Sequence, residues 1–236
     1  EIDLVGHDGG ISTGEYIQSL DLTDIYSGWT ETKAIRNKAQ IWTLYALKEL
    51  SALLPFKLLG IDSDNDSEFI NAHLFKFCQD NLITFTRARA YKKNDNCFVE
   101  QKNWSVVRRA VGYSRYDSDK ELFLLNKLYA SLRLYTNFFM PSMKLIEKSR
   151  IGSRIKKIYD TPKSPFRRLL VSDNISNSVK DNLVSTFKSL NPALLKKQIS
   201  NIQNKLAIIQ KLKPKNRDFN DFLLYNYNQA SNTTFV

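Results

Sequence analysis

The chain has 236 residues, a net charge of +11 and two cysteines, and its apolar content suffices for one large domain with or without an appendage. It contains no apolar run of about 18 residues, so no membrane span is expected. Cys78 and Cys97 lack metal-ligand spacing, which argues against a zinc site or a disulfide scaffold. A reducing cytoplasm is the expected location. The chain starts without Met on a predicted core strand and with no signal-peptide pattern, and we expect it to be a fragment.

Charge is divided unevenly along the chain. Residues 1–116 hold 14 Lys and Arg against 15 Asp and Glu, a net charge of −1, whereas residues 117–236 hold 21 against 9, a net charge of +12. This division suits a protein that collects metal in one part and binds a polyanion with another. A solvated, Lys-rich helical surface would give the same counts, so charge alone leaves both interpretations open.

The first half alternates between strand and helix patterns. Ser27-Gly28 between two alternating segments indicates a hairpin, Pro55 ends the first helix, and Asp95 is a candidate N-cap for the last helix. A three-strand meander followed by helix–strand units predicts an α/β fold with a mixed sheet flanked by helices. The predicted elements are strands at residues 1–7, 16–25 and 29–35, a helix at 38–54, a strand at 56–61, a helix at 67–81, a strand at 82–86 and a helix at 95–110.

The second half has a helical pattern around a basic segment. An apolar stripe runs over residues 125–139, residues 140–174 are irregular and basic, and a helix is predicted over 179–190. Apolar residues from 195 to 209 repeat at helical spacing over too short a length for a coiled coil, which favours an antiparallel helical pair. The polar residues after these helices predict a frayed tail.

Three carboxylates stand at the ends or interruptions of predicted core elements: Asp3, Asp64 and Glu100. Singly, each also fits a plain structural role: an edge residue, a turn residue and a first-turn partner of the helix dipole. Acidic groups gathered from separate segments repel one another unless divalent cations lie between them. Two Mg²⁺ or Mn²⁺ ions about 3.5–4 Å apart would neutralise such a cluster and clamp the attacking and leaving oxygens of a phosphodiester.

The acidic segments at residues 61–69 and 91–104 resemble the second and third acidic motifs of the retroviral-integrase-like DDE transposases, and the strand with Asp3 resembles the first motif. Thirty-five residues separate Asp64 from Glu100, an interval similar to that of the family. Residues 128–144 and 159–170 resemble the downstream part of bacterial insertion-sequence transposases. We therefore divide the chain into an integrase-type catalytic core (1–116), a helix with a basic connector (117–174) and a C-terminal helical region (175–236).

The resemblance implies a ribonuclease-H-like mixed sheet followed by a mostly helical, basic region. It also implies that Asp3, Asp64 and Glu100 hold two Mg²⁺ (or Mn²⁺) ions and catalyse DNA strand cleavage and strand transfer. The expected partners are DNA, as transposon ends and target, and further copies of the chain in the active complex. The candidate DNA contacts are Tyr91, Lys92, Lys93, Asn96, Asn103, Arg108, Lys156, Lys157, Arg167 and Arg168.

One departure from the family leaves other functions open. Asp66 stands where the family usually has Gly. The Asp side chain adds negative charge, and Asp tolerates a positive φ less well than Gly does. A degenerate transposase fragment that acts only as a DNA-binding helical module is one alternative. A ribonuclease-H-like nuclease, which cuts without joining, is the other.

Histidines and tryptophans receive structural interpretations from sequence. His7 has no Cys or His partners and is predicted to be a loop residue. His73 falls on the apolar stripe of its helix and is predicted to be a core histidine. Trp29, Trp42 and Trp104 are predicted to be core residues.

Overall fold

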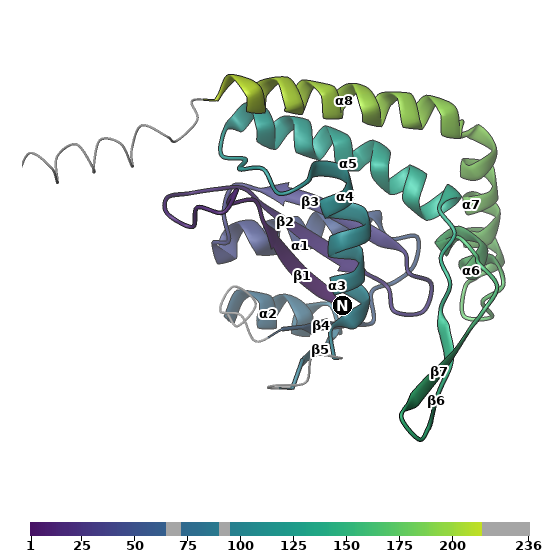
Figure 1. Ribbon diagram of the computed structural model, residues 1–236. Coiled ribbons are helices and arrows are strands. Elements are labelled where there is room, and N and C mark those ends of the chain that lie inside the picture. Colours follow the sequence, from purple (N-terminus) through teal and green to yellow (C-terminus); the bar gives the residue numbers. More distant parts are fainter. Residues whose placement is uncertain (65–71, 90–94, 214–236) are drawn as a thin grey trace, which may run out of the picture.

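Five strands form one mixed sheet at the centre of the protein, and helices cover both of its faces (Figure 1). The computed structural model describes residues 1–64, 72–89 and 95–213. The strands are β1 (Ile2–Gly6), β2 (Gln18–Thr23), β3 (Thr30–Ile35), β4 (Gly60–Ser63) and β5 (Thr84–Arg87). Their order is β3-β2-β1-β4-β5, with β1 antiparallel to β2 and parallel to β4. The expected α/β fold, with a mixed sheet flanked by helices, is confirmed.

Side chains of strand β1 pack into two apolar layers, one on each face of the sheet, because successive side chains of a strand point to opposite faces. Ile2 packs with Leu47 in one layer, and Val5 packs with Val107 and Leu128 in the other. Full burial of each such aliphatic side chain contributes about 1.5–3 kcal/mol. The first layer lies under α1 (Gln40–Leu53) and α2 (Ala72–Asp80); the second lies under α3 (Cys97–Lys102), the π-helix η1 (Asn103–Arg108), α4 (Arg109–Val111), α5 (Asp119–Phe139) and α8 (Pro192–Leu212).

Helix α5 closes the outer edge of the sheet with two asparagine side chains. Asn126 accepts from Ala34 N and donates to Ala34 O, both at 3.0 Å, and Asn137 makes the same pair of bonds to Thr30 at 2.9 and 2.8 Å. These contacts satisfy backbone groups on the edge strand β3 that would otherwise be open to pairing with another chain. The start of α5 is fixed by a capping box between Ser118 and Glu121.

Helix α8 lies antiparallel to α5, which is the helical pair expected from the 195–209 pattern. The stripe supplies its buried face, with Ile199, Ile202 and Leu206 in the same apolar layer as α5. Bonds near opposite ends of the two helices give their relative direction, because Gln198 contacts Ser131 whereas Gln210 contacts Glu121.

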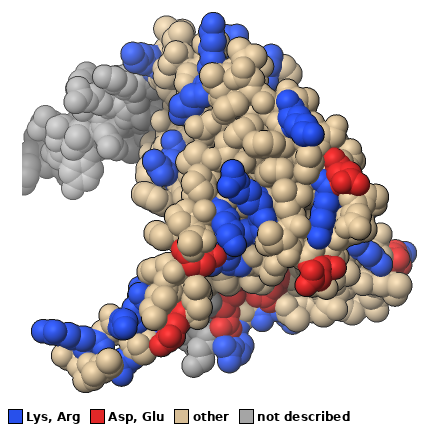
Figure 2. All heavy atoms as spheres, turned by 90° about the vertical axis from the view of Figure 1, so that its right-hand side faces the viewer, with Lys and Arg blue, Asp and Glu red and all other residues tan. Residues whose placement is uncertain are grey.

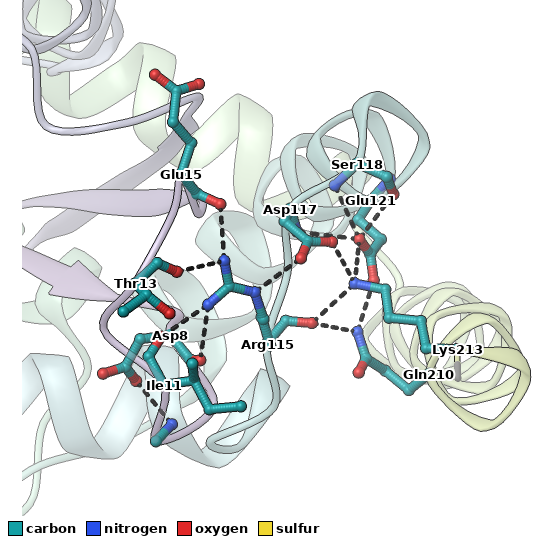
Figure 3. Close-up of polar contacts among 11 residues, drawn as sticks. Asp8, Ile11, Thr13, Glu15, Arg115, Asp117, Ser118, Glu121, Gln210 and Lys213 are labelled. Atoms are coloured by element: carbon teal, nitrogen blue, oxygen red, sulfur yellow. Dashed lines mark hydrogen bonds and ion pairs between the residues drawn. The ribbon is translucent and has the colours of Figure 1, made fainter. Parts of the chain in front are cut away.

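The end of α8 is joined to the sheet domain through Arg115 (Figure 3). The Arg115 guanidinium donates to the carbonyl oxygens of residues 8, 11, 13 and 15 in the loop between β1 and β2, and pairs with Asp117. Lys213 Nζ donates to the Arg115 carbonyl at 3.0 Å and pairs with Asp117 at 2.7 Å and Glu121 at 2.8 Å. One cluster therefore ties the β1–β2 loop, the start of α5 and the end of α8 together.

The segment from 140 to 174 has regular structure where the sequence predicted an irregular connector. Residues 145–151 and 154–159 form an antiparallel hairpin, which was missed because the polar run at 147–150 lacks the alternation that identifies a strand from sequence. An aromatic cluster of Trp29, Phe138, Phe166 and Phe187 holds the elements that follow the hairpin. The strands of the hairpin are β6 (Leu145–Ile151) and β7 (Arg154–Tyr159), and the helices that follow it are α6 (Pro165–Leu170) and α7 (Asn177–Ser189).

Several single-residue predictions differ from the structure. His73 is exposed on α2, whose buried residues are Leu74 and Cys78. Trp29 is buried, but Trp42 is 37% and Trp104 60% exposed. Helix periodicity placed these residues approximately, but small rotations about a helix axis decide which side chains face the core. No helix in the described part of the chain is long and apolar enough to cross a membrane.

Candidate active site at the β1–β4 edge

The pairing of β1 with β4 brings Asp3 and Asp64 together. Ile2 is in register with Ser63 in this parallel pair, so the next residues along both strands, Asp3 and Asp64, are neighbours. Asp64 directly follows β4. Two acids that lie far apart in sequence therefore meet because β4 ends beside the start of the parallel strand β1.

Helix α3 brings Glu100 and Asn103 to the same edge. Asn103 Nδ2 donates to Asp3 Oδ2 at 2.6 Å, and Leu4 N donates to Asp3 Oδ1 at 2.8 Å. Glu100 lies one turn before Asn103, in the first turn of α3, and is exposed to solvent. The backbone changes from α- to π-helical at Asn103. Such π-helical turns are often found at functional sites because they re-aim side chains without ending the helix.

The pKa of the Asp3 carboxyl reflects this arrangement. This pKa is raised to about 6, mainly by burial and also by the negative charges of Asp64 and Glu100, against the lowering effect of the bonds from Leu4 and Asn103. The Coulombic effect of both other acids on Asp3 indicates that the three carboxylates share one region.

Asp21 and Lys102 belong to the same region and were missed from sequence. Asp21 is paired with Asp3 across the β1–β2 ladder and is fully buried. Burial raises the pKa of Asp21 to about 7, and the nearby Lys102 opposes that rise. Burial lowers the pKa of Lys102. The available signal was the alternation Leu20-Asp21-Leu22, which puts Asp21 on the opposite face from the two leucines; the strand register then places it on the face that carries Asp3.

The donor chemistry of this region fits a hard divalent cation. Carboxylate oxygens are the ligands that Mg²⁺ and Mn²⁺ prefer, and mutual repulsion among the acids is relieved by a cation. Asn103 Oδ1 is buried and has no hydrogen-bond partner, which adds an unsatisfied oxygen beside Asp3. Within residues 1–64, 72–89 and 95–213, however, no three His, Cys, Asp or Glu side chains are already gathered at the spacing of a metal site.

The candidate DNA contacts fall into different environments. Tyr91, Lys92 and Lys93 lie outside the described residues, as does Asp66. Asn96 is buried, and its amide lies 3.5 Å from the Ile2 carbonyl.

Arg108 donates to the carbonyl oxygens of Gly6 at 2.8 Å and Gly112 at 3.3 Å and stacks over Tyr113, so its side chain is held against the sheet domain. Lys156, Lys157 and Arg167 are exposed. Arg168 is only 7% exposed and its Nη atoms bind Asp160 at 2.5 and 3.2 Å, which assigns it to holding the base of the β6–β7 hairpin.

His7 follows β1 in the loop that the sequence predicted, but its side chain is buried in the core. It has no solvent exposure, and its Nε2 lies 2.8 Å from Ser19 Oγ, which in turn lies 2.7 Å from Tyr129 OH. Burial and the charge of Arg108 lower its pKa to about 3, so His7 is neutral at physiological pH. The backbone turns inward after β1, and a neutral imidazole with a hydroxyl partner is tolerated there.

Comparison with known proteins gives one relative by sequence and several by structure. No protein-family model matches the chain. The uncharacterized protein y4rM of Sinorhizobium fredii is 45% identical over 168 residues, which is 71% of this chain and 48% of that protein. The chain thus spans about half the length of that relative.

Similar solved structures include two magnesium complexes of the HTLV-2 integrase catalytic core domain and a simian T-cell lymphotropic virus intasome in complex with the PP2A regulatory subunit B56 gamma. The dimeric and trimeric HTLV-2 forms are each 17% identical, with TM-scores of 0.43 and 0.42; they cover 60% and 58% of this chain, and 86% and 83% of theirs. The intasome chain is 12% identical with a TM-score of 0.46, covering 68% of this chain and 66% of its own.

Proposed function

We propose that this chain is the catalytic part of a DNA transposase that cleaves and joins DNA strands by metal-dependent phosphoryl transfer. The observation that carries the proposal is the in-register pairing of Ile2 with Ser63, which makes Asp3 and Asp64 neighbours. The bond from Asn103 to Asp3 adds the helix of Glu100 to them. The likeness of these three segments to the acidic motifs of DDE transposases supports the same chemistry.

In this proposal Asp3, Asp64 and Glu100 would hold two Mg²⁺ or Mn²⁺ ions. When bound, such ions stabilise the attacking and leaving oxygens of a phosphodiester. Leu4 N and Asn103 orient the Asp3 carboxylate by binding one oxygen each. Glu100 is exposed and free to turn toward the other two acids. No covalent intermediate with the protein is needed, so the reaction requires no nucleophilic Ser, Cys or Tyr.

The DNA would be held by cationic and polar groups around and beyond the acids. Asn103 lies at the site itself, while Lys156, Lys157 and Arg167 are exposed in the cationic second half. Tyr91, Lys92 and Lys93 precede the Glu100 helix in sequence and are proposed to touch the substrate strand. Pairing of two transposon ends would bring together further copies of the chain.

The decisive variant is Glu100→Gln. Because Glu100 is exposed, the amide should leave the fold and duplex affinity unchanged, while Mg²⁺-dependent strand transfer should fall by at least about a hundredfold. Transfer is measured with a labelled DNA end and a target plasmid. Asp181→Asn, which removes an exposed acid from α7, is the matched control and should transfer normally. Undiminished transfer by Glu100→Gln would refute the role of this residue.

Two alternatives are separated by the same assay. A ribonuclease-H-like nuclease would cut the labelled strand but would not join a pre-cleaved 3′-hydroxyl end to the target. A degenerate transposase that binds DNA only would do neither and would show no heat of Mn²⁺ binding by titration calorimetry. The proposal expects joined products from the pre-cleaved end.

A further inference from the structure

The β6–β7 hairpin stands out from the body of the protein with neither face covered. Every residue of its two strands is exposed apart from Ser149, which is half-buried. The hairpin projects away from the sheet and its helices, and Figure 2 shows lysine and arginine side chains gathered on a projecting arm. A two-stranded hairpin alone in water is marginally stable, so an uncovered one is best explained by a partner that covers it.

The register of the hairpin concentrates positive charge on one face. Lys148 is directly opposite Lys157, and two positions further along Arg150 is opposite Ile155. Directly opposite residues share a face of a ribbon, and so do residues two positions apart along a strand, so these two pairs lie on the same face. The pair Lys148–Lys157 places like charges side by side, which destabilises a ribbon unless an anion lies against it.

The other pairs carry more cations than anions as well. Arg154 is opposite Ile151 and Lys156 is opposite Ser149, while Glu147 is the only acid of the two strands. In the part of the chain that the structure describes, no carboxylate forms an ion pair with Lys148, Lys156 or Lys157. The cationic groups of the arm are therefore available to a polyanion.

The base of the hairpin is fixed beside the candidate active site. Asp160 accepts from Lys144 N at 2.6 Å and from the Arg168 guanidinium, which also donates to the Ser142 carbonyl at 2.7 Å. Lys144 Nζ donates to the Ile25 and Tyr26 carbonyls and lies 5.7 Å from the centre of the Phe98 ring, two residues before Glu100. An exposed arm on a fixed base keeps a defined direction relative to the acids.

We propose that the β6–β7 hairpin is an arm that binds in a groove of duplex DNA next to the segment held at the acids. The inference rests on the proposed function for the presence of DNA. A two-stranded ribbon is narrow enough for the major groove, which is about 12 Å wide and 8.5 Å deep. Lys148 and Lys157 contact the phosphates. Ile151, 73% exposed beside the turn at Gly152, contacts base edges. Lysines along both strands oppose the alternative of pairing with a second hairpin, since like charges repel at such an edge.

The test compares the salt dependence of duplex binding by the full chain without divalent metal. In Lys148→Gln/Lys157→Gln, the slope of log affinity against log salt should become shallower by about 1.8, at about 0.9 for each lost phosphate contact. Affinity at about 0.1 M salt should fall by more than tenfold. The matched control, Lys197→Gln/Lys205→Gln, removes two exposed lysines from α8, and its slope should equal that of the wild type. Ile151→Ser should weaken binding without changing the slope.

Each other outcome overturns the inference. Equal slopes for the hairpin variant and the wild type, or equal loss in the α8 control, would mean that the arm makes no specific contact. A change in sedimentation mass instead of DNA affinity would assign the arm to a second copy of the chain. The binding assay contains no metal, so it is independent of catalysis. Loss of strand transfer in Glu100→Gln therefore tests the proposed function alone, and an unchanged salt slope in the hairpin variant tests the arm alone.

Discussion

At the scale of single residues, the half-buried Asp3 and the fully buried Asp21, which lie side by side, dominate the candidate site. Asp3 and Asp21 are opposite one another on β1 and β2, and burial raises the pKa of both, to about 6 and about 7. One oxygen of Asp21 accepts from Thr32 Oγ1 at 3.0 Å, and the other has no partner. Removing carboxylates from water is unfavourable for folding, so the presence of both acids is better explained by a charge that function brings to the site.

Metal affinity should therefore depend on pH around the pKa of Asp3. We expect the apparent Mn²⁺ affinity of the full chain to fall as the pH is lowered through about 6, because a proton on Asp3 competes with the cation. Titration calorimetry at about pH 5.5, 6.5 and 7.5 measures this. Asp3→Asn should bind weakly at all three. Equal wild-type affinity at the lowest and highest pH would contradict the expectation.

The same raised pKa values predict how stability changes with pH. A carboxyl with a raised pKa in the folded state contributes stability that is present below its unfolded pKa of about 3.8 and is lost as the pH rises through the folded value. The free energy of unfolding should thus decline between about pH 4 and 7, by a few kcal/mol at about 1.4 kcal/mol for each pKa unit. Urea unfolding across this range measures the decline.

A pair of variants isolates the contribution of Asp21. Asp21→Asn should make the decline shallower, because no proton is bound or lost at that position. Asp160→Asn is the control: Arg168 lowers the pKa of Asp160 to about 2, which places its titration below the window. An unchanged decline in Asp21→Asn would show that this acid does not titrate there.

At the scale of elements, the packing of α8 on α5 attaches the C-terminal region to the sheet domain. Ile199 is 2% exposed and lies in the same apolar layer as Val5 and Leu128. Ile199→Ala should lower the free energy of unfolding by about 2–4 kcal/mol through lost burial and the cavity left behind. Leu194→Ala on the same helix, at a position that is 58% exposed, should change it by less than about 1 kcal/mol. Chemical denaturation of both variants measures these changes. Similar losses of unfolding free energy in the two variants would mean that α8 is not packed as described.

At the scale of the whole molecule, the Arg115 cluster connects parts that lie about a hundred residues apart. Glu121 has no side-chain exposure and accepts from Lys213 at 2.8 Å. Lys213→Met should lower the free energy of unfolding by about 1–3 kcal/mol, because the buried carboxylate loses a cationic partner. Lys211→Met, an exposed lysine of the same helix end, should have almost no effect. Thermal unfolding compares the two, and equal melting temperatures for both variants would mean that the cluster adds no stability.

Sequence by itself determined the order of elements in the first half, since strand alternation and helical spacing are local. It also determined the apolar face of α8, and it predicted the three acids as site residues, because their motifs and interval can be read along the chain. Only tertiary structure decided that Asp21 lies against Asp3, that His7 and not His73 is buried, and that Arg168 holds a hairpin. Those outcomes depend on strand register, helix rotation and long-range pairing, which arise from contacts between segments that local patterns do not encode.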